Sequence, residues 1–169
     1  RSKEKPGALN FVSSGVGSIL HLSTELFMKR AGISMTHVPY SGSGPALMDL
    51  VAGRADVFIT TVPVVANHVQ ERTLTLLAST GDERSPIFPD APTLTESGVR
   101  GAGMYTLWGI VGPPNMSADL VAQLNKAVND AAASPAMVKR FAEEGATPYR
   151  GTPEEFGKVL EKERETWRR

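Results

Sequence analysis

Near its start the chain reads LNFVSSGVGS, from Leu9 to Ser18, where a short apolar run gives way to a loop of glycine and serine. The apolar run, Leu9–Ser13, predicts a buried β-strand. Ser18 is a typical N-cap, and apolar residues at helical spacing predict a helix from there to about Ala31, with Gly32 as its stop. A strand that leads through a glycine-rich loop into a helix is typical of α/β folds.

The same strand–loop–helix pattern continues along the chain. The following elements are predicted in order: a strand at Met35–Val38, a helix from Pro45 to Gly53, a strand at Ala55–Thr60, a helix at Val62–Gln70 and a strand at Leu74–Ser79. Alternation of strands and helices with short loops indicates right-handed crossovers and a parallel sheet covered on both faces.

The pattern changes after the predicted fourth strand. Three prolines make Gly81–Pro92 an irregular connection, and Thr93-Leu94-Thr95-Glu96 forms a capping box. Tyr105–Val111 predicts a long strand, with Tyr105 and Trp108 in the core. Three amphipathic helices are then predicted at Ser117–Ala133, after Ser134-Pro135, and from Thr152 to the C-terminus. These helices need a partner sheet, and we expect it to belong to sequence that is absent.

The composition excludes several classes of function. The chain has 169 residues, 18 basic and 18 acidic side chains and no cysteine, so neither a nucleic-acid-binding field nor a thiolate site is expected. No apolar run is long enough to span a bilayer. The polar lead-in Arg1–Gly7 has no signal-peptide core, which leaves open a cytoplasmic protein or a processed piece of an exported one.

The glycine–serine loop carries a possible binding function. At the start of a helix, free backbone N–H groups and the helix dipole attract anions, and serine hydroxyls add donors without charge. The loop lacks the lysine of a P-loop and the third glycine of a dinucleotide fingerprint, because Leu20 stands there. From this string alone, an anion site and a plain structural turn both remain open.

Two further loops repeat the theme. Pro39–Gly44 is again rich in serine and glycine, and Thr60-Thr61 ends the third predicted strand. The carboxyl ends of parallel strands meet on one edge of a sheet, where ligands of open α/β folds bind. Three neutral, hydroxyl-bearing loops on one edge favour a ligand site there.

Other interpretations of the same residues are weaker. Ser18 and His21 lie three residues apart on one helix, but no nucleophile elbow surrounds the serine, so a Ser/His hydrolase remains only an alternative. His21, His37 and His68 lack the spacing of metal ligands on one element, and no cofactor is expected. An effector domain of a transcription regulator is a second alternative, although no DNA-binding segment accompanies it.

Taken together, the motifs resemble the Bug receptors, the periplasmic solute-binding proteins of tripartite tricarboxylate transporters. The resemblance spans essentially the whole chain in order and rests on these strings: Leu9–Ser18, His21-Leu22, Glu25-Leu26-Phe27, Gly32, His37-Val38-Pro39-Tyr40-x-Gly42, Asp49-Leu50-x-x-Gly53, Leu77-Ala78, Arg84, Pro89-Asp90-x-Pro92-Thr93, Glu96-x-Gly98, Trp108-Gly109, Pro113-Pro114 and Thr152–Phe156.

The resemblance implies an α/β receptor with two lobes of the type II periplasmic-binding-protein class. Residues 9–101 would form the second ligand-binding lobe, with a parallel-rich sheet flanked by helices. Residues 102–169 would supply a crossover strand and helices to a first lobe whose N-terminal half is absent. A chain left in this state would expose apolar helix faces, and we expect two copies to bury them in a homodimer, by exchange of the strand 105–111 or otherwise.

The resemblance also implies what the chain binds and where. The expected ligand is a small organic carboxylate, held in the periplasm for membrane transporter subunits, with no enzymatic activity and no nucleic acid. The residues carried over to the ligand site are Ser13, Ser14, Gly15, Ser18, His21, Tyr40, Ser41, Gly42, Thr60 and Thr61. Thr60-Thr61 departs from the acidic or amide pair frequent in the family, which leaves the identity of the solute open.

Overall fold

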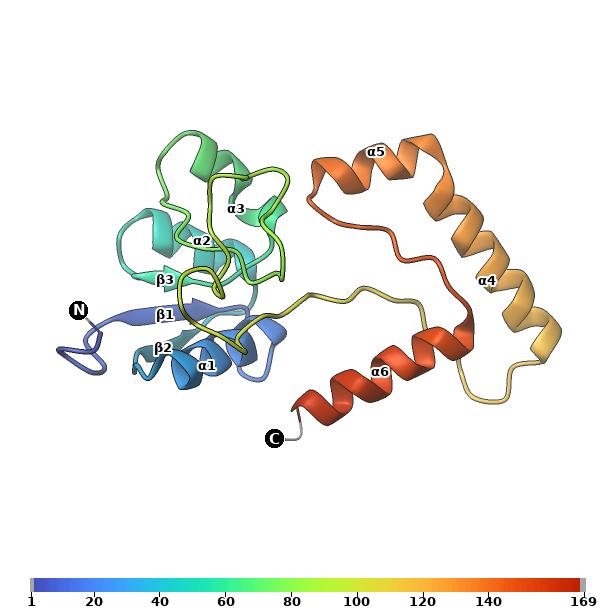
Figure 1. The fold of residues 1–169 in the computed structure, drawn as a ribbon, viewed down its shortest axis with the longest axis horizontal. Coiled ribbons are helices and arrows are strands. Elements are labelled where there is room, and N and C mark those ends of the chain that lie inside the picture. The colour runs from blue at the N-terminus through green and yellow to red at the C-terminus, as the bar shows by residue number, and fades with distance from the viewer. Residues whose placement is uncertain (1, 168–169) are drawn as a thin grey trace. The chain divides into compact units, whose positions relative to one another are not determined.

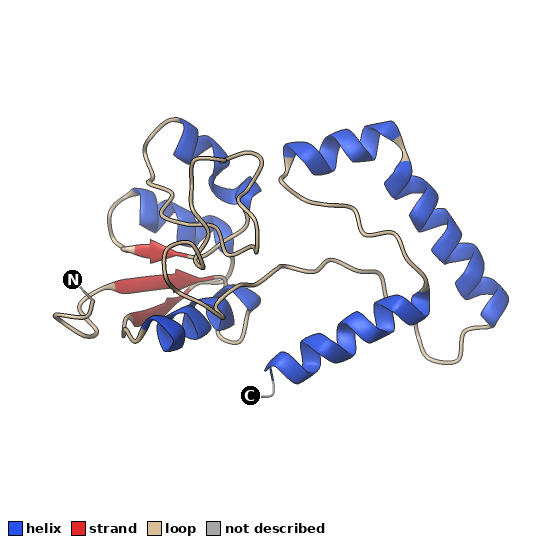
Figure 2. Ribbon diagram, in the orientation of Figure 1, coloured by secondary structure: helices blue, strands red, loops and turns tan. Residues whose placement is uncertain are grey.

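The computed structural model describes residues 2–167, apart from the side chain of Thr166. The chain divides into two compact units, one ending at Leu107 and the other beginning at Trp108, and each is described by itself. The first unit contains the strands and three helices, and the second contains three helices (Figures 1 and 2).

A three-stranded parallel sheet forms the centre of the first unit. Strands β1 (Asn10–Ser13), β2 (Thr36–Pro39) and β3 (Val57–Phe58) lie in the order β2-β1-β3. Helix α1 (Ile19–Ala31) connects β1 to β2, and helix α2 (Ser43–Val51) connects β2 to β3. Because β1 lies in the middle of the sheet, its C-terminal loop has a neighbouring strand on both sides.

Alternation along β1 divides the core into two layers. Phe11 is fully buried and packs with Met28 of α1 and with Met35. Val12, the next residue, points to the opposite face and packs with Ala46 of α2 and with Ala55. Figure 1 shows α1 on one side of the sheet and α2 with α3 (Val62–Gln70) on the other. The predicted covering of both faces is therefore confirmed.

The predicted helix ends are confirmed in atomic detail. The Ser18 hydroxyl accepts a hydrogen bond from the backbone N–H of His21, as an N-cap does. Gly32 ends α1 with φ of 62°, and its N–H donates to the carbonyl of Met28. In the second unit, the Thr152 N–H donates to Oε2 of Glu155 and the Glu155 N–H donates to Oγ1 of Thr152, which is a capping box at the start of α6.

Two predicted strands are wrong. Leu74–Ser79 is not a strand, because only Ser79 bridges Thr93, and the neighbouring Pro92 has no N–H with which to extend a ladder. Tyr105–Val111 is not a strand either, since no segment within residues 2–167 pairs with it. Tyr105 and Trp108 are exposed rather than in the core, Trp108 by 85%.

The segment between α3 and Leu107 is irregular but held by specific contacts. Thr93 and Glu96 form the predicted capping box, with Thr93 N–H to Glu96 Oε2 at 2.7 Å and Glu96 N–H to Thr93 Oγ1 at 3.0 Å. Arg84 pairs with the same carboxylate and with the carbonyl of Pro89. Thr80 exchanges two hydrogen bonds with Met104. These contacts attach the end of the first unit to its body.

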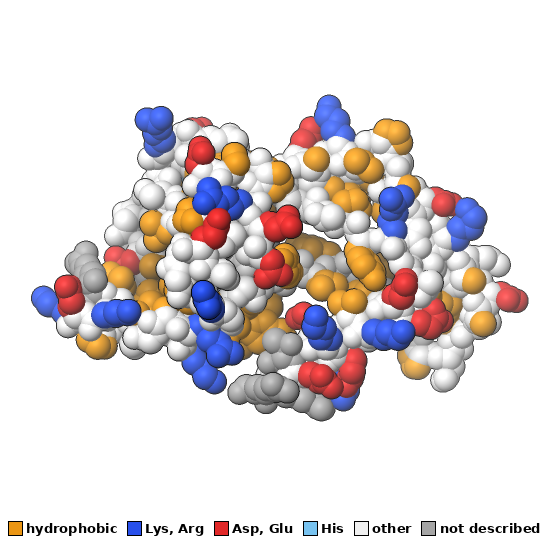
Figure 3. Space-filling view, in the orientation of Figure 1, with side chains coloured by type: hydrophobic (Ala, Val, Ile, Leu, Met, Phe, Trp, Pro, Cys, Tyr) orange, Lys and Arg blue, Asp and Glu red, His pale blue; other side chains and the backbone are white. Residues whose placement is uncertain are grey.

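The second unit contains α4 (Ala118–Ala133), α5 (Pro135–Glu143) and α6 (Pro153–Trp167). Ser134 alone separates α4 from α5, and a longer irregular segment leads from α5 to α6. All three helices were predicted; the last two residues of the predicted final helix lie outside the described residues. Large apolar side chains remain at the surface, as Figure 3 illustrates, and Leu124 of α4 is 48% exposed. Among the described residues, no helix is long and apolar enough to cross a membrane.

Candidate functional site at the carboxyl edge of the sheet

Three helices begin just after the carboxyl ends of the three strands. The chain passes from β1 to the N-cap Ser18, from β2 to the N-cap Gly42 and from β3 to the N-cap Thr61. The first N–H groups of each helix have no partner within that helix, and the helix dipole makes this end positive. The parallel topology thus gathers three anion-attracting helix starts on one edge of the sheet, formed by neighbouring strands.

The loop after β1 is held by its own serines. Ser13 is fully buried; its hydroxyl accepts from the N–H of Gly15 at 3.2 Å and lies 2.7 Å from Nε2 of His37. The Ser18 hydroxyl donates to the carbonyl of Gly15 at 2.8 Å. Gly15 and Gly17 have φ of 132° and 77°, which side-chain-bearing residues rarely adopt. The glycines therefore allow a curved loop whose backbone is accessible at the sheet edge.

His21 supports this loop from the first turn of α1. Its Nδ1 accepts a hydrogen bond from the backbone N–H of Gly17 at 3.2 Å, and its Nε2 lies 3.5 Å from Oε1 of Glu25. The side chain is only 17% exposed. His21 therefore fixes the loop geometry instead of projecting into solvent.

His37 is a member of the site that sequence reasoning missed. Its ring contacts those of both Phe11 and His21, with centroids 4.7 Å and 4.0 Å away. Burial lowers the pKa of His37, the nearby His21 lowers it further, and Glu25 opposes both effects. In the structure His37 on β2 pairs in register with Phe11 on β1, so both side chains lie on the face that α1 covers. The sequence does not give this register.

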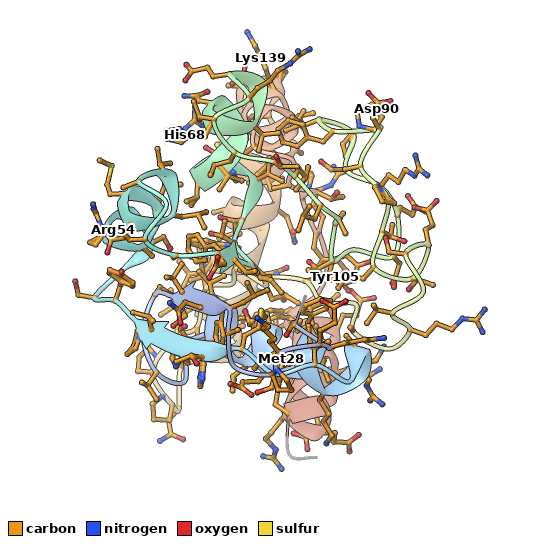
Figure 4. All side chains as sticks on the ribbon, turned by 90° about the vertical axis from the view of Figure 1, so that its left-hand side faces the viewer. Met28, Arg54, His68, Asp90, Tyr105 and Lys139 are labelled. Carbon is orange, nitrogen blue, oxygen red and sulfur yellow. The ribbon has the colours of Figure 1, made fainter. Side chains whose placement is uncertain are left out.

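Tyr40 of the second loop is hydrogen-bonded to an ion pair formed by Asp49 of α2 and Arg54, which follows α2. Tyr40 donates its hydroxyl hydrogen bond to Asp49 Oδ2, and Nε of Arg54 donates to Asp49 Oδ1 at 2.9 Å. The hydrogen bond to Asp49 raises the pKa of Tyr40, while Arg54 and then Tyr40 lower the pKa of Asp49. Figure 4 shows Arg54 at the surface, well away from Met28 of the core. The Tyr40 hydroxyl is thus directed to α2, and the N–H of Tyr40 donates to Ser13.

The third loop contributes hydroxyl groups with unused capacity. The Oγ1 atom of Thr60 is buried and has no hydrogen-bond partner among the described residues. Thr61 is the N-cap of α3, yet its side chain makes no capping hydrogen bond. Thr60 thus has a buried hydroxyl without a partner among residues 2–167, and the Thr61 hydroxyl can bind a ligand or a water without breaking a capping contact.

The edge as a whole is polar but carries no formal charge of its own. No lysine, arginine, aspartate or glutamate occurs in the three loops 13–18, 40–43 and 60–62. Such an edge can accept a carboxylate through backbone N–H groups and hydroxyls. Among the described residues, no cluster of three or more His, Cys, Asp or Glu side chains is arranged to bind a metal ion.

The geometry gives no support to the hydrolase alternative. The Ser18 hydroxyl is bonded to the carbonyl of Gly15 and to the N–H of His21, while the His21 ring bonds to Gly17. The serine and imidazole therefore make no nucleophile–base pair with each other.

All ten residues expected at the site lie in the three loops or in the first turn of α1. The β1 loop and Tyr40 are in direct contact. The N–H of Tyr40 donates to the carbonyl of Ser13, and a Cβ atom added at Gly15 would lie only 3.5 Å from the Tyr40 carbonyl oxygen. The hydroxyls of Ser14 and Ser41 make no hydrogen bond to the described residues, and Gly42 presents only its backbone at this edge. Thr60 and Thr61 follow β3 on the other side of β1.

Comparison with known proteins defines the class of protein. R. palustris Rpa4515 "with adipate" matches with a TM-score of 0.91 and 32% identity, over 99% of this chain and 56% of that one. MatC from Rhodopseudomonas palustris "with bound malate" matches with a TM-score of 0.84 and 28% identity, over 95% and 56%. The fold is that of a periplasmic-binding-protein-like solute receptor, as the resemblance implied.

The family follows from the sequence. A family described as "Tripartite tricarboxylate transporter family receptor" matches residues 1–169, and the chain belongs to it. Protein BugT of Bordetella pertussis is 34% identical over 165 residues, which are 98% of this chain and 51% of BugT. The resemblance to the Bug receptors is thus confirmed. The chain spans about half the length of BugT and of another curated relative that it matches.

Proposed function

We propose that this chain provides a ligand-binding lobe of an extracytoplasmic receptor that captures a small organic carboxylate for a tripartite tricarboxylate transporter. The observation that carries the proposal is the convergence of three helix N-termini, with hydroxyls and no charged side chain, on one edge of the sheet. The two similar Rhodopseudomonas palustris structures, one with adipate and one with bound malate, support the ligand class.

In this proposal a carboxylate group lies at the start of α1. It accepts hydrogen bonds from backbone N–H groups of the loop 13–18 and from the hydroxyl of Ser14, and the loop 40–42 borders it from β2. Thr60 and Thr61 border it from β3, directly or through a water. Neutral donors hold the anion without a salt bridge, as phosphate is held at other helix N-termini.

The exposed apolar surface of the second unit is consistent with packing against another lobe. Apolar side chains on α4 are nearly half exposed, which is costly for an isolated helix bundle. We propose that residues 9–101 form the second ligand-binding lobe and that residues 102–169 pack on a first lobe built by other sequence. The receptor would act in the periplasm beside membrane transporter subunits, and it would bind its solute without chemical conversion.

Nuclear magnetic resonance on the ¹⁵N-labelled chain tests the ligand site. Adipate and malate should shift the backbone amide signals of Gly15, Gly17 and Gly42, while adipamide, which has no negative charge, should not. We expect weak binding, because a single lobe leaves the carboxylate largely hydrated. If no dicarboxylate shifts these amides at millimolar concentration, the proposed site is rejected.

A further inference from the structure

His21 is held in one tautomer by the loop that it supports. The backbone N–H of Gly17 can only donate, so the Nδ1 atom that receives it at 3.2 Å carries no proton. The neutral ring therefore has its proton on Nε2, on the side of Glu25. A second proton on His21 must enter at Nδ1, where it replaces the hydrogen bond from Gly17.

His37 is hydrogen-bonded to the same loop through Ser13. Its Nε2 lies 2.7 Å from the hydroxyl of Ser13, and that hydroxyl also bonds to the N–H and the carbonyl of Gly15. The hydroxyl can donate to a neutral His37 or accept from a protonated one. His37 can thus change charge without losing its partner, and the change passes through Ser13 to Gly15.

The two rings cannot both be charged at low cost. They are stacked with centroids 4.0 Å apart and planes 17° apart, so two imidazolium charges would repel each other at close range. The uptake of a proton is therefore a property of the two coupled rings together and is not assigned to one of them. The first proton places one positive charge directly beneath the loop 13–18.

A carboxylate bound to that loop makes a positive charge on the histidine pair more favourable. Without a ligand, the positive end of α1 opposes a charge beside it, and burial lowers the pKa of His37. A bound anion compensates for the positive charge, and loss of the Gly17 bond to His21 releases one more N–H that can donate to the ligand. We propose that the His21–His37 pair couples carboxylate capture at the loop 13–18 to the uptake of one proton.

The charged surroundings of the pair are limited. Glu25, on the same helix as His21, lies 3.5 Å from its Nε2 and acts to raise the pKa of His37, while the β1 residues beside the pair, Phe11 and Ser13, carry no charge. On β2 the neighbouring ionic group is Tyr40 with Asp49, which Arg54 already compensates. The proposal rests on the proposed function, because it requires a carboxylate at this edge.

Calorimetry with adipate on the 169-residue chain measures the proton directly. Titrations near pH 6.5 in buffers of different ionisation enthalpy should show a net uptake greater than zero and at most one proton. Adipate affinity should fall by up to tenfold per pH unit above the range in which the pair titrates, although adipate stays ionised there. His21→Gln, which keeps an acceptor for Gly17, and His37→Gln should each reduce the uptake and flatten the pH profile.

His68→Gln is the matched control. His68 lies on α3, is hydrogen-bonded to Thr73 and is distant from Met28 of α1 (Figure 4), so its replacement should leave the uptake unchanged. Adipate binding with no proton uptake by the unmodified chain would overturn the proton coupling and leave the proposed function intact. No adipate binding, with unshifted Gly15 and Gly17 amides, would reject both. Uptake that survives in both His21→Gln and His37→Gln would assign the proton to another group.

Discussion

Tyr40 and Asp49 are joined by a hydrogen bond from the tyrosine hydroxyl to Oδ2 of the carboxylate, so the polar end of Tyr40 is directed to α2. Only the backbone of Tyr40 takes part in the β1 loop, through its N–H to Ser13 and the proximity of its carbonyl to Gly15. The expected ligand role of Tyr40 therefore divides into a backbone part and a hydroxyl part.

Comparison of Tyr40→Phe with Ser14→Ala tests whether the Tyr40 hydroxyl takes part in ligand binding. Tyr40→Phe should leave adipate affinity nearly unchanged, because the lost hydroxyl serves Asp49. Ser14→Ala should weaken binding by about 1–3 kcal/mol, because it leaves a ligand oxygen without its donor. Calorimetry on a receptor with both lobes measures the two variants side by side. A larger loss for Tyr40→Phe than for Ser14→Ala would reverse this assignment.

Phe11→Ala should destabilise the first unit strongly. Phe11 is fully buried between β1 and α1 and also supports the ring of His37, so truncation leaves a cavity that costs roughly 3–5 kcal/mol. Urea unfolding measures the loss. Leu77→Ala is the matched control, since Leu77 is 72% exposed in the same unit and should change stability little.

Gly32→Ala should also destabilise the chain, by about 1 kcal/mol. Gly32 closes α1 at φ of 62°, a conformation that costs energy for a residue with a Cβ atom. Gly157→Ala is the comparison, because Gly157 lies inside α6 with open space around it and should gain roughly 0.5–1 kcal/mol from helix propensity. Thermal unfolding measures the change in stability of both variants. Equal changes would contradict the left-handed cap at Gly32.

Stability should fall as the solution is acidified below pH 6.5. The pKa of His37 is lowered in the folded chain by burial and by His21, so the unfolded chain binds more protons in the window between the folded pKa and the ordinary value of 6.5. The free energy of unfolding therefore rises with pH in this window and is fully present above it. Urea unfolding between pH 5 and 7.5 tests this. His37→Gln should flatten the slope there, whereas the carboxylates Asp49 and Glu96 act only at lower pH.

The chain by itself should form dimers. Leu120, Leu124 and Val128 lie along one side of α4 and are each more than 40% exposed, and burial of such a side chain yields about 1.5–3 kcal/mol. A second copy can cover this face when no first lobe does. Light scattering at several concentrations should show a mass that increases with concentration, and Leu124→Glu should restore the monomer. A monomer at all concentrations for the unmodified chain would refute the prediction.

Local sequence determined the elements that depend on local interactions. Ser18 and Gly32 bracket α1 because cap hydrogen bonds and a left-handed φ are properties of a few neighbouring residues. The same holds for the capping boxes at Thr93 and Thr152. The order of strands and helices also fixed the sheet edge on which the three loops meet, since parallel strands share one carboxyl end.

Tertiary structure alone decided what needs a partner distant in sequence. The segment 105–111 has the apolar character of a strand but is not one, because a ladder requires a second strand beside it, and the described residues supply none. The stack of His21 on His37 and the turn of Tyr40 toward Asp49 likewise depend on the register of β1 with β2 and on the placement of α1 and α2 against them. Periodicity indicates which face a side chain occupies, whereas its neighbour on that face is chosen by packing between elements.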